Sequence, residues 1–317
     1  MTHAIRPHSH DPADRVDDAL ASSRAGMRAV WVSLLVLGMT AALQAAVVVR
    51  SGSVALLSDV IHNAADALTA VPVGVAFLLG RRAATRRFTY GFGRAEDVAG
   101  LVVVLVIAAS AVAAGVASVR RLAEPAEIDQ LWLVAAAALV GFAGNEVAAQ
   151  VRIRAGRRIG SAALVADGMH ARADALTSLA VLLSVGGAAL GWNWADPVVG
   201  LLITAAIVAV TWTAARQVLD RLMDAVDPAL VDRAEAALRS VAEVRAVDGI
   251  RLRWIGHALH AEVEVTIADS LSLRLAHEVA HEAEHRLRHA VPRLSAATVH
   301  AYPRSAPPDG RPNQPEP

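Results

Sequence analysis

The chain contains no cysteine among its 317 residues. This absence excludes disulfide bonds, thiolate zinc sites and cysteine nucleophiles. The formal net charge is zero, so the composition gives no reason to expect nucleic acid as a partner. The first 25 residues have neither an apolar core nor a small-residue cleavage site, and we therefore expect no cleaved secretory signal.

Long hydrophobic runs dominate the first two thirds of the chain, which is 55% hydrophobic overall with a mean hydropathy of +0.43. Six runs are long enough, at about 20 residues or more, to cross a membrane as helices. They cover residues 27–49, 54–80, 97–119, 130–150, 162–190 and 197–217. The sequence therefore predicts an all-α, six-helix transmembrane bundle.

Arginines are concentrated in alternate connections of this predicted bundle. They precede the first run and gather between runs two and three and between runs four and five, whereas residues 191–196 contain none. Positive charge near membrane helices stays on the cytoplasmic side, so both termini are expected in the cytoplasm. The expected location is the plasma or inner membrane of the cell, with multiple passes.

The chain changes character after residue 222, where shorter periodic segments replace the hydrophobic runs. The alternation Glu262-Val263-Glu264-Val265 is typical of a half-buried strand. The predicted order is helix, strand, strand, helix, strand, over residues 229–241, 246–254, 259–268, 273–289 and 296–301. We predict an N-terminal cytoplasmic tail (1–25), a membrane domain (26–222), a cytoplasmic ferredoxin-like or metallochaperone-like α+β domain (223–304) and a disordered tail (305–317).

The pattern His-x-x-x-Asp occurs in both the second and the fifth hydrophobic run, as His62 with Asp66 and as His170 with Asp174. A spacing of four residues places both side chains of a pair on one helical face. Ionisable groups at membrane depth are costly, so they usually face a bundle interior and mark a pathway or a site. Two imidazoles and two carboxylates suit a tetrahedral divalent cation such as Zn²⁺. We therefore predict that these four residues form a metal transport site.

Metal and protons compete for these ligands, because metal binding requires neutral imidazoles and ionised carboxylates. Histidine, with an ordinary pKa of about 6.5, exchanges its proton near physiological pH. This predicts antiport, in which entering protons expel the metal. Zn²⁺ is the favoured cargo, and Co²⁺, Ni²⁺ and Fe²⁺ stay open as alternatives because affinity alone does not separate them. The absence of sulfur ligands argues against Cu⁺.

Asp59 and Asp167 each precede the histidine of a pair by three residues, on nearly the same helical face. They either hold the imidazole in its orientation or relay protons and metal. The alternative is that both are interfacial carboxylates in water. Glu146, near the cytoplasmic end of the fourth run, is expected to pair with a loop arginine.

Further motifs accompany the two pairs: SGSVALLSD at 51–59, YGFGRAE at 90–96, ADGMH at 166–170, AHE at 276–278 and VHAYP at 299–303. With these motifs the chain resembles the cation diffusion facilitator family of metal-ion/proton antiporters, over residues 25–303. The resemblance implies a homodimer whose tail domains meet in the cytoplasm, and transport by alternating access. Some members place a second metal site in the loop before the third helix. Phe88 and Phe92 stand at the corresponding positions here, so we predict no metal in this loop.

The resemblance also implies a regulatory metal site in the tail domain. Asp248, His257, His277 and His300 lie near positions where family members bind metal, whereas Tyr302 replaces a carboxylate ligand. The alternative is that these histidines only cover strand and helix surfaces. A separate stripe on one helix, His277, His281, His285 and His289, recurs every fourth residue and offers successive pairs as chelates, or is simply a solvated face.

Two other classes of function compete with a metal exporter. A membrane metalloenzyme would keep an open coordination position with typically three protein ligands, whereas the two pairs together supply four. The His-Glu-x-x-His spacing of zinc proteases occurs only outside the hydrophobic runs, at 277–281 and 281–285 in the predicted tail helix. We therefore expect no enzyme and no resident cofactor, with the metal as substrate and possible regulator. A membrane metal sensor that signals through the tail domain stays open.

Overall fold

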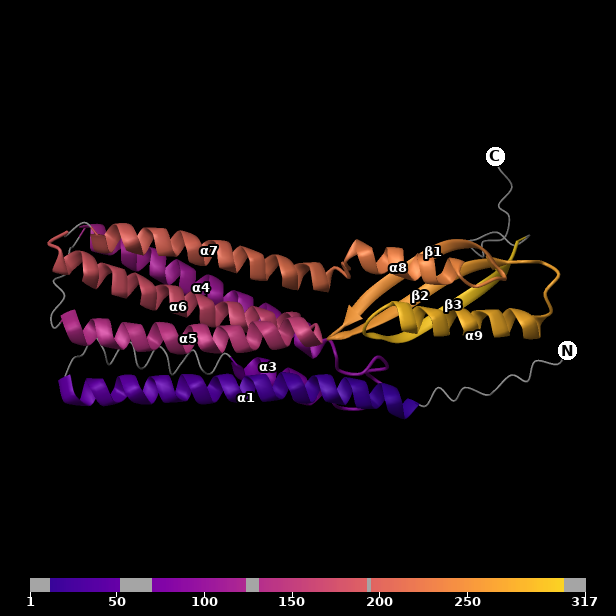
Figure 1. Ribbon diagram of the computed structural model, residues 1–317, viewed down its shortest axis with the longest axis horizontal. Coiled ribbons are helices and arrows are strands. Elements are labelled where there is room, and N and C mark those ends of the chain that lie inside the picture. The colour runs from indigo at the N-terminus through magenta and orange to yellow at the C-terminus, as the bar shows by residue number, and fades with distance from the viewer. Residues whose placement is uncertain (1–11, 52–69, 124–130, 193–194, 305–317) are drawn as a thin grey trace. The chain divides into compact units, whose positions relative to one another are not determined.

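The computed structural model describes residues 12–51, 70–123, 131–192 and 195–304 (Figure 1). Two compact units divide between Leu219 and Asp220. The first unit is entirely helical in its described parts, and the second combines helices with a three-stranded sheet. A helical bundle followed by a small α+β domain is the fold class that the sequence predicts, and this prediction is confirmed.

The helices of the first unit follow the predicted hydrophobic runs and often extend beyond them. They are α1 (Pro12–Ser51), α3 (Ala70–Gly80), α4 (Ala95–Ala123), α5 (Leu131–Ile159), α6 (Ala162–Ala189) and α7 (Ala195–Leu222). Four of the described helices contain stretches long and apolar enough to cross a membrane, namely Arg24–Ala46, Ala95–Arg120, Leu131–Ile159 and Val198–Leu222. The predicted count of six spans is therefore shown only in part, because most of the second run (54–69) lies outside the described residues.

The α6 helix is an interior helix of this unit. It packs against α5 and α4, and α5 in turn packs against α1. Polar residues interrupt its apolar sequence, yet most of its first four turns are buried. Charged groups inside a helical bundle are expected to face protein neighbours in this way. Figure 1 shows α6 running alongside α5 over most of its length.

A tight turn and a capped start place α6 against α5. Gly160 adopts a φ of 77°, a left-handed conformation that glycine accepts without strain. Ser161 then caps α6, since its hydroxyl accepts from the backbone N–H of Leu164. The same hydroxyl donates to the buried Glu96 carboxylate at the start of α4, at 2.8 Å. These contacts fix the beginning of the helix that carries the second His-x-x-x-Asp pair.

Small residues allow α5 and α6 to pack closely. A Cβ atom on Gly168 would come within 2.6 Å of the Ile153 side chain and 2.9 Å of its backbone nitrogen. Gly156 on α5 is equally close to the backbone of Val165. Such contacts leave no room for a larger side chain, as is common where membrane helices associate through small residues.

The second unit has the predicted order of elements: α8 (Pro228–Arg239), β1 (Val244–Ile255), β2 (Ala258–Ile267), α9 (Leu273–Ala290) and β3 (Leu294–Pro303). The sheet order is β1-β2-β3, with β1 antiparallel and β3 parallel to β2. Asp227 caps α8 and Ser272 caps α9, each by accepting from a backbone N–H of the first turn. This is the αββαβ arrangement expected from the periodicity of residues 229–301.

The core of the second unit lies between the sheet and its two helices. In β2, Leu259, Ala261, Val263, Val265 and Ile267 are buried, and the intervening residues are more exposed. This is the alternation that the sequence predicts for the strand. From the helices, Leu238 and Leu287 complete the same apolar cluster.

Candidate functional site

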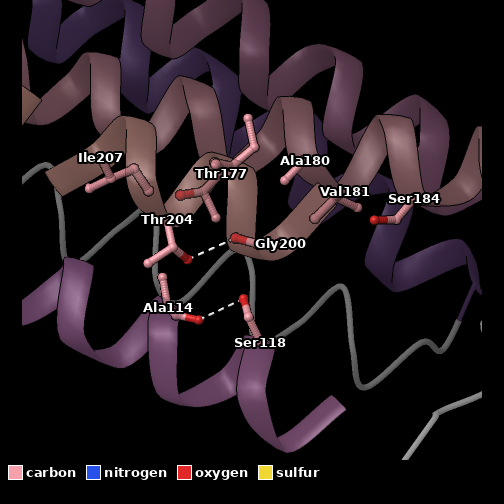
Figure 2. Close-up of a pocket in the computed structure, with 10 residues that line it drawn as sticks. Ala114, Ser118, Thr177, Ala180, Val181, Ser184, Gly200, Thr204 and Ile207 are labelled. Atoms are coloured by element: carbon pink, nitrogen blue, oxygen red, sulfur yellow. Dashed lines mark hydrogen bonds between the residues drawn. The ribbon is translucent and has the colours of Figure 1, made fainter. Parts of the chain in front are cut away.

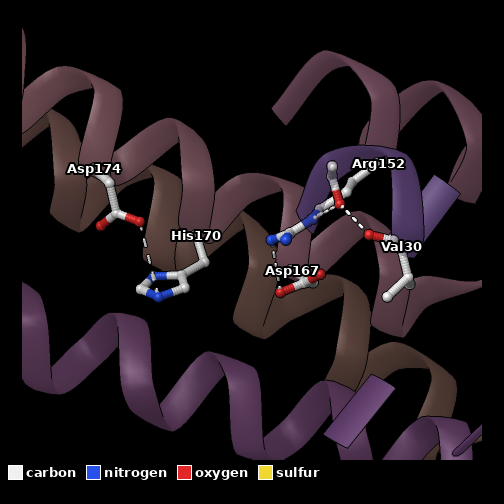
Figure 3. A network of polar contacts seen from close by, with 6 residues as sticks. Val30, Arg152, Asp167, His170 and Asp174 are labelled. Atoms are coloured by element: carbon white, nitrogen blue, oxygen red, sulfur yellow. Dashed lines mark hydrogen bonds and ion pairs between the residues drawn. The ribbon is translucent and has the colours of Figure 1, made fainter. Parts of the chain in front are cut away.

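The second His-x-x-x-Asp pair lies inside the helical unit, on one face of α6 (Figure 3). The side chains of His170 and Asp174 are 1% and 7% exposed, and His170 Nε2 is 3.9 Å from Asp174 Oδ2. Two ligands of a tetrahedral zinc ion, each at about 2.0–2.1 Å, are separated by about 3.3 Å. Small rotations of the two side chains are therefore enough for both to reach one ion.

The first pair, His62 and Asp66, lies outside the described residues, together with Asp59. The assembly of all four ligands into one centre therefore stays a prediction. The described half has the chemistry that such a centre requires: a buried imidazole and a buried carboxylate on one helical face.

Asp167 is held one turn before His170 by an arginine that the sequence did not single out (Figure 3). Arg152 Nη1 of α5 lies 3.1 Å from Asp167 Oδ1, and both side chains are at most 1% exposed. Arg152 Nε also donates to Ser33 Oγ of α1 at 2.7 Å. The Ser33 hydroxyl in turn donates to the Val30 carbonyl oxygen. This network joins α1, α5 and α6, and its burial does not fit an Asp167 carboxylate in water.

The sequence did not identify Arg152 as buried, because the fourth hydrophobic run was predicted to end too early. That run ends at residue 150, which makes Arg152 a loop arginine, whereas α5 continues to Ile159 and buries it. The missed signal was that residues 151–159 contain no proline and include four arginines and an alanine, which favour helix. A basic residue inside a packed helical interface calls for a carboxylate partner.

A second ion pair links the same two helices. Glu146 of α5 accepts from Arg172 at 2.7 Å (Nη2) and 3.2 Å (Nε), and from Gln150 at 3.1 Å. The expectation of a loop arginine as partner is wrong, because Arg172 belongs to α6 and stands between His170 and Asp174 in the sequence. The helical rotation of two residues turns Arg172 away from the face that His170 and Asp174 share.

A cavity of about 140 Å³ lies among α4, α6 and α7 (Figure 2). Hydroxyl groups of Ser118, Thr177, Ser184 and Thr204 line it together with small apolar residues. Thr177 stands three residues after Asp174, so the cavity begins about one helical turn from the buried pair. The walls are mainly apolar, and the hydroxyls of Ser118, Thr177 and Thr204 donate to backbone carbonyls of their own helices.

The tail-domain residues singled out by sequence do not come together within one chain. Asp248 is exposed and accepts from Thr266 Oγ1 at 2.7 Å, while the His300 ring stacks on Tyr302 with 4.2 Å between ring centroids. His257 is partly buried, and His277 is exposed on α9. Throughout the described parts of the chain, no three His, Asp or Glu side chains are grouped to hold a metal ion. A shared site with a partner subunit stays a prediction.

The loop before α4 holds aromatic contacts where some relatives were expected to bind metal. The rings of Phe88 and Phe92 lie 4.7 Å apart, and the guanidinium of Arg87 stands 5.7 Å from the Phe88 ring centroid. Gly91 has a φ of 76°, as a tight turn requires. Neither ring can ligate metal, and the absence of a metal site in this loop stays a prediction.

Comparison with known families assigns most of the chain. The model of the family described as "Cation efflux transmembrane domain" matches residues 30–223, and that described as "Cation efflux protein, cytoplasmic domain" matches residues 226–304.

Curated relatives agree with these matches. The chain is 59% identical over 297 residues to the probable cation efflux system protein Rv2025c of Mycobacterium tuberculosis, covering 94% of this chain and 90% of that protein. It is 24% identical to the manganese efflux system protein MneP of Bacillus subtilis, covering 79% of this chain and 87% of that protein. Among solved structures, a nickel form of the MamM CTD is 23% identical, covers 25% of this chain and 99% of that chain, and has a TM-score of 0.24.

Proposed function

Because the chain belongs to the cation diffusion facilitator family of divalent cation efflux transporters, we propose that it exports Zn²⁺ from the cytoplasm in exchange for protons. The family is one of transporters rather than enzymes. The observation that carries the proposal is the His170–Asp174 pair, buried on one face of α6 with 3.9 Å between Nε2 and Oδ2.

The proposed transport site combines His170 and Asp174 with His62 and Asp66. Two nitrogen and two oxygen ligands favour a tetrahedral ion over Mg²⁺ or Ca²⁺, which prefer more oxygen ligands. One relative is named for manganese efflux. Imidazole suits zinc better than manganese, so the histidine in each pair favours zinc for this chain. Co²⁺, Ni²⁺ and Fe²⁺ are the runner-up cargoes by the same mechanism.

Proton coupling follows from the same ligands. When protons reach the site, the imidazoles become cationic and lose the lone pairs that hold the metal. When protons leave toward the cytoplasm, the four groups again present two neutral nitrogens and two carboxylates. The cavity that begins near Thr177 would supply part of a proton path between the site and the non-cytoplasmic side.

The ion pairs around α6 give this cycle a rigid frame. Arg152 fixes Asp167 against α5 and α1, and Arg172 fixes α6 to Glu146 of α5. We propose that α1, α5 and α6 therefore move together when access to the site alternates. Both termini would lie in the cytoplasm, and the tail domains of two chains would meet there as a homodimer, with the protein in the plasma or inner membrane.

Flux into proteoliposomes tests the proposal. Zn²⁺ entry is measured under an imposed pH gradient for the wild type, for His170→Ala and for His289→Ala, an exposed tail-domain histidine outside the proposed site. We expect gradient-dependent flux in the wild type and in His289→Ala, and none in His170→Ala. Flux in folded His170→Ala equal to that of the wild type would overturn the site. Flux of Co²⁺, Ni²⁺ or Fe²⁺ but not Zn²⁺ would overturn the cargo alone.

A further inference from the structure

The α9 helix carries two histidines that touch each other on its exposed side. Its inner face is apolar, with Val279, Ala283 and Leu287 buried against the sheet. On the outer side, His277 Nε2 lies 3.1 Å from His281 Nε2, and the rings meet edge to face with 4.4 Å between their centroids. Both side chains are exposed to solvent.

The separation of the two nitrogens matches what one metal ion requires. For nitrogens 3.1 Å apart, each at about 2.05 Å from a shared ion, the angle at the ion is about 98°. This value lies between the angles of octahedral and tetrahedral coordination. At this distance one ring donates an Nε2–H to the Nε2 of the other, and the tautomers decide which ring is the donor. A cation would replace that proton without moving the helix.

We propose that His277 and His281 form a two-histidine binding site for a divalent first-row transition-metal ion. Imidazole nitrogens suit Zn²⁺, Ni²⁺ and Cu²⁺, whereas Mg²⁺ and Ca²⁺ prefer oxygen. Glu284 lies one turn further along the helix, with Oε2 3.9 Å from His281 Nδ1. A carboxylate on that side favours the tautomer with its proton on Nδ1 and leaves Nε2 to bind the metal.

The other histidine pair of the stripe is arranged differently. The rings of His285 and His289 are 4.2 Å apart, but His289 Nδ1 contacts the backbone carbonyl of His285 at 2.9 Å. This contact ties the His289 ring to the last turn of the helix. The stripe therefore contains one pair of nitrogens set for a shared ion, and His285 with His289 provides a matched control on the same helix.

This site is separate from the transport site and does not depend on it. Two protein ligands on an exposed surface leave the remaining coordination positions to water, so ions exchange freely with the solution. The site would capture metal ions at the surface of the tail domain.

Equilibrium dialysis against Ni²⁺, in excess Mg²⁺, tests the site on the full-length protein in detergent micelles. An Asp174→Ala background weakens metal binding at the transport site, so the result is independent of flux. We expect His277→Ala and His281→Ala each to lose the same one equivalent of Ni²⁺, and His289→Ala and His300→Ala to keep it. All four substitutions are at exposed positions, so we expect the variants to fold, and circular dichroism verifies this.

Either of two results would overturn the proposal: an unchanged Ni²⁺ count in His277→Ala and His281→Ala, or an equal loss in His289→Ala or His300→Ala. The second result would place the metal elsewhere on the stripe or in a centre shared with β3. Electron paramagnetic resonance of bound Cu²⁺ gives a second readout. Two nitrogen couplings are expected for this site, and one after His281→Ala; two couplings that persist in His281→Ala would also overturn the assignment.

Discussion

Two pairs of side chains in this chain share a spacing of four residues on a helix, yet one pair is buried and the other exposed. His170 and Asp174 lie inside the helical unit, whereas His277 and His281 stand on the outer side of α9. The buried atoms are 3.9 Å apart and the exposed nitrogens 3.1 Å. In the two proposals above, the same spacing serves a buried transport site and an exposed binding site.

Burial determines how the charge of a bound ion is compensated at each pair. At the exposed pair, water completes the coordination and the charge of the ion is screened. At the buried pair, an ion must be matched by the charge and ligands that the protein supplies, since uncompensated charge at membrane depth is costly. In the proposed exchange, protons supply the compensating charge at the buried pair when the ion leaves.

Removing the buried carboxylate is expected to have the largest effect on function. Asp174→Ala should lower Zn²⁺ flux in proteoliposomes by more than about 100-fold, because loss of groups that merely orient a ligand already costs 10–100-fold. The protein should keep its oligomeric state in size-exclusion chromatography. Flux within a few-fold of the wild type would show that the buried pair does not carry the metal.

The second-largest effect is expected from breaking the buried Arg152–Asp167 ion pair, because the ion pairs of the tail domain are more exposed. Arg152→Met leaves the Asp167 carboxylate uncompensated and should lower the free energy of unfolding by about 3–5 kcal/mol. The double variant Arg152→Met/Asp167→Leu should recover most of this loss, since replacing both members of a buried pair is often neutral. Denaturant titration in detergent micelles measures both changes.

Flux through the double variant then tests whether Asp167 takes part in transport. A folded double variant that still transports Zn²⁺ would mean that the Asp167 carboxylate is needed neither to orient the imidazole nor to relay protons or metal. A folded double variant without flux would mean that the carboxylate is needed in one of these two roles. An unchanged stability in the single variant Arg152→Met would instead contradict the buried ion pair.

Much of the fold followed from periodicity, whereas the partners of the polar residues did not. The alternation in β2 predicted both the strand and its buried face, because successive side chains of a strand point to opposite faces. The buried position of His170 and Asp174 followed from the cost of charge in a membrane. By contrast, the partner of Asp167 comes from another helix, and no spacing within one segment identifies it.

The end of α5 shows why hydropathy alone missed Arg152. Hydropathy marks where a helix leaves the apolar part of a membrane, but the backbone continues as helix as long as its residues favour it. α5 runs nine residues past the predicted end at 150, and Arg152 lies within that extension. The 3.1 Å contact of His277 with His281 is a similar case, because spacing predicts that two rings can meet and only the rotamers decide whether they do.

The smallest effect is expected in the tail domain, where a histidine is half-buried without a metal role. His260 lies on β2 opposite Arg253 of β1, and Arg253 is paired with Glu262 at 3.0 Å. Burial lowers the pKa of His260 below its ordinary value of 6.5; Arg253 lowers it further, and Glu262 partly opposes the change. The folded domain therefore favours the neutral ring.

The sign of the pH dependence follows from this lowered pKa. The unfolded chain takes up a proton near pH 6.5, before the folded domain does, so stability is present above that pH and declines as the pH falls toward the folded pKa. We expect a loss of less than about 1 kcal/mol, because the ring is only half-buried.

Hydrogen exchange of residues 258–267 in the full-length protein, between about pH 7.5 and about pH 5, should show this loss of stability, and His260→Gln should flatten the profile. A profile that is equally steep in His260→Gln would assign the decline to other groups. If the stability of the tail domain depends only weakly on pH, the pH dependence of flux is expected to come from His170 and Asp174.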